Sequence, residues 1–206
     1  MMKNKKINYL FAHGAGAPST SEWMTCVSSL IEKRSLGEIK VTRFNFPFME
    51  KRLMENKKFP PDKMPKLIEE WIRQIENFEL NERLFIGGKS MGARACTLID
   101  FPNLNHKILG VINFGFPFHA PGKEPGNRIT HLEKFSIKCL INQGERDPMG
   151  SREEITQYLL SKKIKFNYLA DGDHDLMPRK KSGLTLERNL INAVDCAIEF
   201  MRENVQ

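Results

Sequence analysis

The sequence has no long hydrophobic run and no small-residue cleavage site near its start. Charged residues interrupt every apolar stretch within about a dozen residues, which is too short for a membrane-spanning helix. The basic first six residues are followed by only a short apolar run, so we expect no signal peptide. These absences argue against a membrane or exported protein and favour a cytoplasmic location.

Cysteine is scarce, and the few cysteines are not paired in sequence. The chain has four, with no CxxC spacing, so the sequence gives no sign of a disulfide framework. Each lies in an apolar stretch, and we expect buried free thiols, in agreement with a reducing compartment. The four residues are Cys26, Cys96, Cys139 and Cys196.

The chain also lacks internal repeats, low-complexity segments and an interdomain linker. Its 206 residues fit one domain and bury enough surface to fold without disulfides or structural metal. A composition of 40% hydrophobic and 28% charged residues argues against disordered and fibrous classes. We therefore expect a single domain over residues 1–206, whose oligomeric state the sequence leaves open.

The net charge of +7 raises the question of nucleic-acid binding. The Lys and Arg residues are spread along the chain, however, without an RNA-binding aromatic signature or zinc-finger spacing. Such charges usually belong to solvated faces and loops. We expect neither a nucleic-acid nor a membrane partner.

Short apolar runs alternate with helical patterns along the whole chain, which predicts a parallel sheet with crossover helices. The segment 45–61 is polar and bounded by proline, so we expect it to be irregular, and Asp62 is the expected N-cap of the next helix. The predicted strands are Ile7–Ala12, Ile39–Phe44, Arg83–Gly88, Ile108–Phe114, Ile137–Gln143 and Phe166–Leu169. The predicted helices are Ser21–Lys33, Asp62–Phe78, Met91–Asp100, Glu153–Leu160 and Thr185–Glu203.

A G-x-S-x-G motif around Ser90 joins the third predicted strand to a helix. In this setting the serine hydroxyl is pushed out above the sheet, and glycines two residues away on each side remove colliding side chains. A phosphate-binding loop would need a glycine five positions before Gly88, where Arg83 stands instead. Ser90 is therefore the candidate nucleophile.

A nucleophilic serine needs a base, and the base needs an orienting acid. Among five histidines, His174 follows the last predicted strand, at the edge where open α/β sheets assemble their sites. Asp147 follows the fifth strand and gives the chain order serine, aspartate, histidine, with Glu145 as the alternative acid. His119 is expected to line the pocket.

Two further readings of glycine-rich and acidic segments fail on spacing. Around His174 the aspartates match the first ligands of a calcium loop, but Leu176 and Ser182 occupy its obligatory glycine and glutamate positions. The turn after the first strand lacks the third glycine of a dinucleotide motif, since Ser19 stands there. We expect no metal and no cofactor.

An oxyanion formed in acyl transfer needs two backbone N–H donors. We expect one from Met91, directly after the serine, and one from Ala15, in the turn after the first strand. Four phenylalanines on loops at the same end of the sheet are candidates for an acyl pocket, with loop-anchoring core as the equal alternative. They are Phe46, Phe48, Phe116 and Phe118.

Together these segments resemble the α/β-hydrolase superfamily, most of all its small dienelactone-hydrolase-like branch, which includes α/β-family hydrolases related to a testis-expressed human protein. The resemblance implies a minimal three-layer α/β/α sandwich with about six mostly parallel strands and no cap domain. Dienelactone hydrolases carry a cysteine nucleophile where Ser90 stands, so their substrate is not implied. The segments are His13–Ala17, Phe44–Phe48, Gly87–Gly92, Gly115–His119 and Gly172–His174.

The sequence thus predicts a serine hydrolase acting on small or medium acyl esters or thioesters through an acyl-enzyme. Some relatives in this branch resemble non-catalytic parts of larger complexes, so a binding or scaffold protein is the alternative. A hydrogen bond between Ser90 and His174 discriminates between them.

Overall fold

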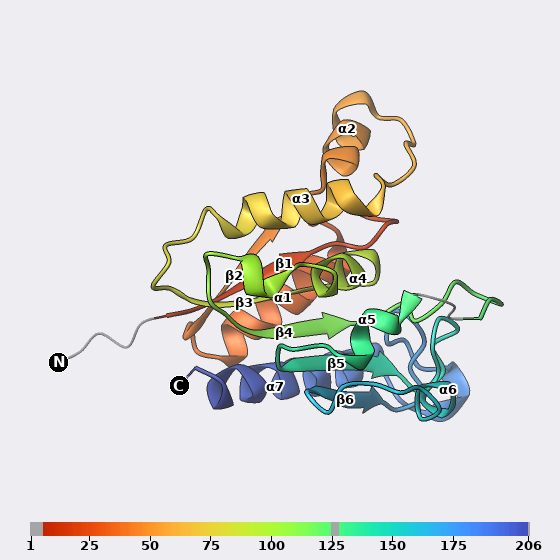
Figure 1. Cartoon of the computed structure of the whole chain (residues 1–206). Helices are drawn as coiled ribbons and strands as arrows, with labels where there is room; N and C mark the ends of the chain where they lie inside the picture. Colours follow the sequence, from red (N-terminus) through yellow and green to blue (C-terminus); the bar gives the residue numbers. More distant parts are fainter. Residues whose placement is uncertain (1–5, 125–127, 206) are drawn as a thin grey trace.

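The computed structural model describes residues 6–124 and 128–205, so residues 1–5 of the basic start lie outside the description. Six strands form one sheet in the order β2-β1-β3-β4-β5-β6, and every neighbouring pair is parallel (Figure 1). This confirms the predicted parallel sheet. The strands are β1 (Ile7–Ala12), β2 (Ile39–Phe44), β3 (Arg83–Gly88), β4 (Ile108–Phe114), β5 (Cys139–Gly144) and β6 (Ile164–Leu169).

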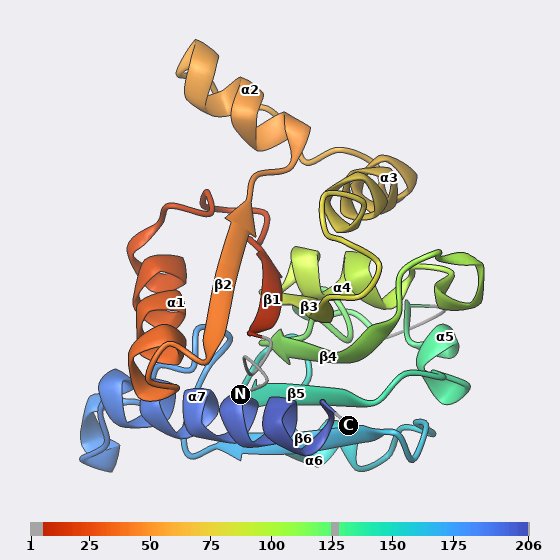
Figure 2. The same ribbon diagram turned by 90° about the vertical axis from the view of Figure 1, so that its left-hand side faces the viewer.

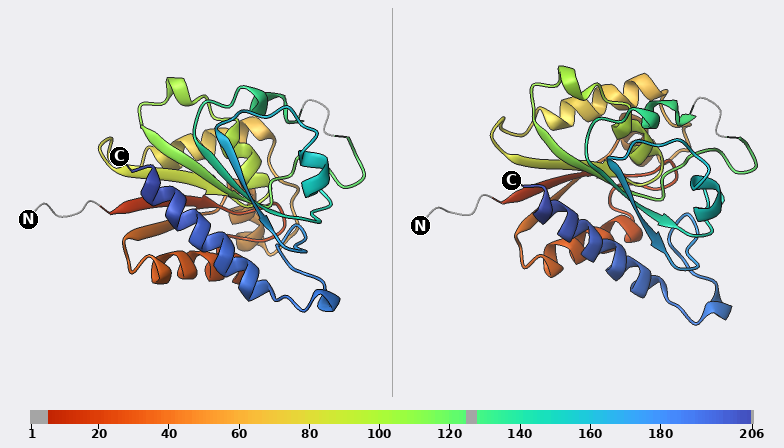
Figure 3. Two further views of the ribbon diagram at one scale, coloured as in Figure 1. Left: turned by 90° about the horizontal axis from the view of Figure 1, so that it is seen from below. Right: turned by 60° about the horizontal axis from the view of Figure 1, so that its bottom comes forward.

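Helices cover both faces of the sheet, which confirms the three-layer sandwich. On one face α1 (Glu22–Arg34) lies beside α7 (Leu186–Glu203), and on the other α3 (Met64–Ile75) lies beside α4 (Met91–Thr97) (Figures 2 and 3). Each face has its own apolar cluster. Because parallel strands are buried on both sides, they appear in sequence as continuous apolar runs.

Strand β1 shows how one run serves both clusters. Tyr9 and Phe11 point into the cluster under α1 and α7, whereas Leu10 and Ala12 belong to the cluster under α3 and α4. All four are fully buried. This period of two is the strand geometry that places alternate side chains on opposite faces.

The segment predicted to be irregular contains a helix, α2 (Pro47–Glu55). Pro47 stands at its first position, where proline costs no hydrogen bond and starts a helix. The Asp62 carboxylate accepts a hydrogen bond from the Phe48 N–H at 3.0 Å, so it caps α2 and not the following helix. Helix α2 projects from the sandwich (Figures 1 and 2), and within the described ranges no cap domain covers the sheet.

Three of the predicted helices differ from the observed ones at their ends. Helix α3 begins two residues after Asp62, with Lys63 at its N-cap position. Helix α4 ends at Thr97 instead of Asp100, and α6 (Arg152–Ile155) is a single turn. The remaining short elements lie in connections: α5 (Thr130–Glu133), η1 (Phe101–Asn103) and η3 (Lys180–Ser182).

The cysteines follow the prediction only in part. Cys96 and Cys139 are buried and free, but Cys26 is exposed and Cys196 is half-buried. Cys26 lies on α1 and Cys196 on α7. A surface helix buries only one face, so a residue within an apolar stretch of sequence can still lie on the outward face. Across the described residues, no helix is both long and apolar enough to cross a bilayer.

Candidate active site

Three side chains from distant parts of the sequence meet at the carboxyl edge of the sheet. Ser90 follows β3, Asp147 follows β5 and His174 follows β6. The Ser90 Oγ lies 2.8 Å from His174 Nε2, and His174 Nδ1 lies 2.7 Å from Asp147 Oδ2. The sequence-predicted serine, histidine and aspartate therefore form one continuous hydrogen-bonded chain.

The backbone at Ser90 is strained, with φ 52° and ψ −113°. A non-glycine residue in such a conformation costs on the order of 1–3 kcal/mol and persists only where its surroundings enforce it. Two hydrogen bonds do so, since the Lys89 N–H donates to Ala12 and the Ser90 N–H to Phe114. The turn consequently holds the hydroxyl above the edge of the sheet, half-exposed.

The two glycines of the motif are required by close backbone contacts. A Cβ on Gly88 would lie 2.5 Å from the backbone carbon of Gly92. A Cβ on Gly92 would in turn lie 2.6 Å from the carbonyl oxygen of His13. Side chains at these positions would push α4 away from the strands, so the spacing of the motif has a direct steric cause.

Asp147 determines the tautomer of His174. A buried carboxylate paired in this way only accepts hydrogen bonds, so Nδ1 of His174 donates to it. Nε2 is left to accept the Ser90 hydroxyl proton. The alternative acid, Glu145, lies elsewhere: its carboxylate binds Arg152 at 2.8 Å and the Asp171 N–H at 3.0 Å.

Gln143 is a part of this site that the sequence analysis missed. It is fully buried at the end of β5, and its Nε2 donates to Asp147 Oδ2 at 2.8 Å. Its amide also accepts the Phe116 N–H at 2.7 Å, which ties two loops together. The Met149 N–H donates a further hydrogen bond to Asp147 Oδ1 at 2.8 Å. A polar residue ending an apolar strand was the signal available in the sequence.

Lys89, the residue before the serine, holds the loop that carries His174. Its ammonium lies 2.5 Å from the Asp175 carboxylate and 3.5 Å from the His174 carbonyl oxygen. Trp23 lies beside it, 5.2 Å from ring centre to ammonium, and its indole N–H donates to the Asp175 carbonyl at 3.0 Å. Neighbouring atoms partly desolvate the exposed Asp175 carboxyl, but the Lys89 ammonium outweighs this effect and lowers its pKa.

The turn after β1 reaches the serine from the other side. A Cβ on Gly14 would lie 3.4 Å from the Ser90 Cβ, so the turn lies beside the serine with room for a small side chain. His13 donates from Nδ1 to the Gly14 carbonyl at 2.6 Å and accepts the Phe46 N–H at Nε2, 3.0 Å away. Burial lowers the pKa of His13 to about 4, so this ring is neutral and structural.

Both predicted oxyanion donors lie at this edge. Met91 is the first residue of α4, and Ala15 follows Gly14 in the turn. Among the residues described, neither N–H has a protein acceptor. The Ala15 carbonyl is held by Arg52 Nη1 at 2.8 Å, which fixes the orientation of the turn.

The predicted acyl-pocket residues are part of the core. His119 is also buried, and its Nδ1 contacts the Ala120 carbonyl at 2.9 Å. Because the phenylalanine rings expose 4% of their surface or less, the loop-anchoring alternative describes them better than an open acyl pocket does. These rings are Phe46, Phe48, Phe116 and Phe118.

The aspartates around His174 hold the loop together. Asp171 pairs with Arg179 and Arg146, and the hydrogen bond from Arg179 lowers the pKa of Asp171 to about 2. Asp173 accepts the N–H groups of Asp175 and Met177. In the described part of the chain, no cluster of three His, Cys, Asp or Glu side chains is arranged to hold a metal.

Comparison with known families agrees with this architecture. The sequence profile of the alpha/beta hydrolase domain matches residues 5–202. The chain belongs to this family. A search of curated proteins gives no match to this alpha/beta hydrolase.

Solved structures share the fold of this alpha/beta hydrolase at low identity. Est1E from Butyrivibrio proteoclasticus, with ferulic acid bound, has a TM-score of 0.68 at 13% identity, covering 99% of this chain and 91% of that chain. A serine hydrolase homologue from Coxiella burnetii has a TM-score of 0.67 at 16% identity, with coverage of 96% and 85%. Dienelactone hydrolase from Anabaena variabilis has a TM-score of 0.65 at 15% identity, with coverage of 98% and 88%.

Proposed function

We propose that this alpha/beta hydrolase is a serine hydrolase that cleaves small or medium acyl esters, including thioesters, through an acyl-enzyme. The single observation that carries the proposal is the hydrogen-bonded chain from Ser90 through His174 to Asp147. A scaffold protein has no need to maintain a strained serine in contact with an oriented imidazole. The family membership and the esterases among its structural neighbours agree with the proposal.

In the first half of the reaction, the Ser90 oxygen attacks the ester carbonyl while His174 Nε2 takes its proton. Asp147 stabilises the resulting imidazolium through the Nδ1 hydrogen bond. The N–H groups of Met91 and Ala15 stabilise the oxyanion, each donor being worth about 10²–10³ in rate. The C–O bond then breaks, and His174 gives its proton to the leaving alcohol.

In the second half, water repeats these steps on the acyl-enzyme. His174 takes a proton from the water as its oxygen attacks the acyl carbonyl. The ester bond to Ser90 breaks, and the proton returns to the serine oxygen. The expected partner is therefore a small acyl substrate. That the chain forms a single domain and is located in the cytoplasm are also predictions.

The test is covalent labelling with a fluorophosphonate probe, compared across the wild type, Ser90→Ala and His174→Ala. The wild type should be labelled, and both variants should lose the label. Ser29→Ala is the matched control, since Ser29 is an exposed serine on the outer surface of α1. A folded wild type that takes no label would favour the scaffold alternative.

A further inference from the structure

A pocket of about 620 Å³ lies between α2, with the loop that follows it, and the turn after β1. It shares Ala15 with the proposed oxyanion site, and a Cβ added to the neighbouring Gly14 would lie 3.4 Å from the Ser90 Cβ, so the turn lies beside the serine. A molecule reacting at Ser90 therefore has this pocket within reach of a short chain. Its lining residues are Ala15, Gly16, Met49, Arg52, Asn56, Lys57, Lys58 and Pro61.

The lining of this pocket has charge of one sign. It contains three cations, Arg52, Lys57 and Lys58, and no carboxylate. The carboxylates of α2, Glu50 and Glu55, line a separate pocket on another side of the helix. The charged side chains of the pocket beside the active-site turn are thus all cationic, whereas the second pocket has both signs, since Lys51 and Arg73 line it as well.

Within residues 6–124 and 128–205, these three cations have no ion-pair partner. Among the described residues, none of them forms an ion pair with Asp or Glu. Three neighbouring positive charges repel one another, and an anion between them would relieve that repulsion. Lys57 and Lys58 are exposed, so their ammonium groups are accessible to an anion from solvent.

Arg52 is already fixed in place. Its Nη1 donates to the Ala15 carbonyl at 2.8 Å and its Nε to the Phe59 carbonyl at 2.6 Å. Its guanidinium also lies over the Phe48 ring, 4.8 Å from the ring centre. A guanidinium has five N–H donors, so donors remain for a ligand after these two bonds. Preorganisation of this kind lowers the entropy cost of binding.

We infer that this pocket binds a carboxylate carried by the ester substrate, so that the enzyme prefers anionic esters over neutral ones. The inference rests on the proposed function, because it assigns a substrate class to the same site. The positive charge of the whole chain, +7, would also favour the approach of an anionic ester.

Two matched substrate pairs test the inference. Mono-4-nitrophenyl adipate and 4-nitrophenyl hexanoate differ by a terminal carboxylate on the acyl side. 4-Carboxyphenyl butyrate and 4-carbamoylphenyl butyrate compare a carboxylate with a neutral amide on the alcohol side. The measured quantity is the ratio of kcat/KM for the anionic ester to kcat/KM for the neutral ester of each pair.

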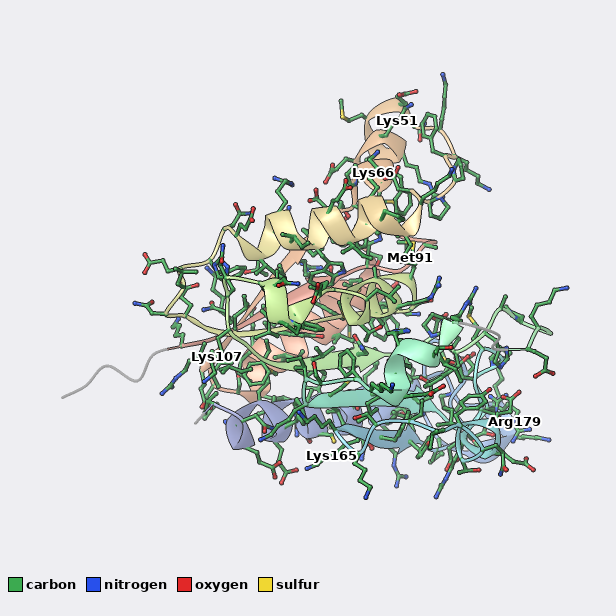
Figure 4. The ribbon with its side chains drawn as sticks, viewed as in Figure 1. Lys51, Lys66, Met91, Lys107, Lys165 and Arg179 are labelled. Carbon is green, nitrogen blue, oxygen red and sulfur yellow. The ribbon has the colours of Figure 1, made fainter. Side chains whose placement is uncertain are left out.

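The test variant is the double substitution Lys57→Gln/Lys58→Gln. Exposed ion pairs are weak, so removing two charges should lower the ratio by about twofold to thirtyfold for at least one pair. The control is Lys33→Gln/Lys107→Gln, which removes the same charge at the amino ends of the strands. Figure 4 shows Lys107 and Met91 at opposite ends of the sheet.

A fall of the ratio in the test variant and not in the control supports the inference. Equal ratios in the test variant and the wild type, for both pairs, overturn it while the proposed function stands, provided that the wild type hydrolyses the neutral esters. A wild type that hydrolyses none of the four esters and takes no fluorophosphonate label would remove both the proposed function and the inference.

Discussion

The two sides of Ser90 are built in different ways. On one side, which we call the relay side, side chains bind side chains: Gln143 holds Asp147, and Asp147 holds His174. On the other, the turn side, side chains bind backbone: His13 and Arg52 hold the carbonyl groups of the turn after β1. The relay side positions the groups that would move a proton, and the turn side positions N–H groups that would bind a charge.

The largest effect should come from breaking the relay side at Asp147. Asp147→Asn keeps the shape of the side chain but can donate to His174, which favours the wrong tautomer and should lower kcat by about 10⁴-fold. Steady-state hydrolysis of 4-nitrophenyl butyrate measures this. Glu145→Gln is the control, and a loss of similar size there would contradict the assignment of Asp147.

An intermediate effect should come from acidifying the turn side. The pKa of His13 is about 4 when folded against 6.5 when unfolded, so the unfolded chain binds the extra proton and stability falls as pH drops through that range. This group alone should cost about 2 kcal/mol between pH 7 and pH 5. Urea unfolding of the wild type at both pH values measures the total loss.

The share of His13 follows from comparison with His13→Asn, whose loss between the two pH values should be smaller by that amount. Burial also lowers the pKa of His131 to about 4, so His131→Gln separates the second contribution. NMR titration of the wild-type imidazoles provides a direct check. A His13 ring that protonates near pH 6.5 in the folded protein would refute the neutral, structural role.

The smallest effect should come from the ion pair between Lys89 and Asp175, which supports the relay side from outside. Its aspartate is exposed, so the coupling energy should be about 0.5–1 kcal/mol. A double-mutant cycle of Lys89→Met and Asp175→Asn, read as kcat/KM, measures it. The Lys89→Arg variant should retain most of the coupling, and strictly additive effects would show that the pair does not position His174.

The relay side was the easier one to predict from sequence. Ser90, Asp147 and His174 each follow a strand, and parallel strands bring such residues to one edge, so chemistry and topology pointed to the same three residues. The bounds of β1, β2, β3 and β4 were predicted to the residue. Strands β1, β3 and β4 are almost entirely buried, whereas β2, at the edge of the sheet, is buried only at its two ends. Gln143 was missed because its role depends on a loop that returns to it.

The turn side was harder, because it depends on which loop approaches which. The segment 45–61 was predicted to be irregular because it is polar and bounded by proline, but Pro47 begins helix α2 within it. Asp62 was assigned to the helix that follows it in sequence, but its carboxylate caps α2 through the N–H of Phe48, fourteen residues earlier in the chain. Arg52 could not be linked to Ala15 without knowing that α2 folds over that turn.

The order in which the strands enter the sheet has a consequence for synthesis of the chain. Ser90 is made before Asp147, and His174 comes only after β6, the last strand. A chain growing from its N-terminus thus contains Ser90 long before it contains His174. A partly made chain should therefore not react with a fluorophosphonate probe. Labelling of Ser90 during translation would then report the moment at which the last strand joins the sheet.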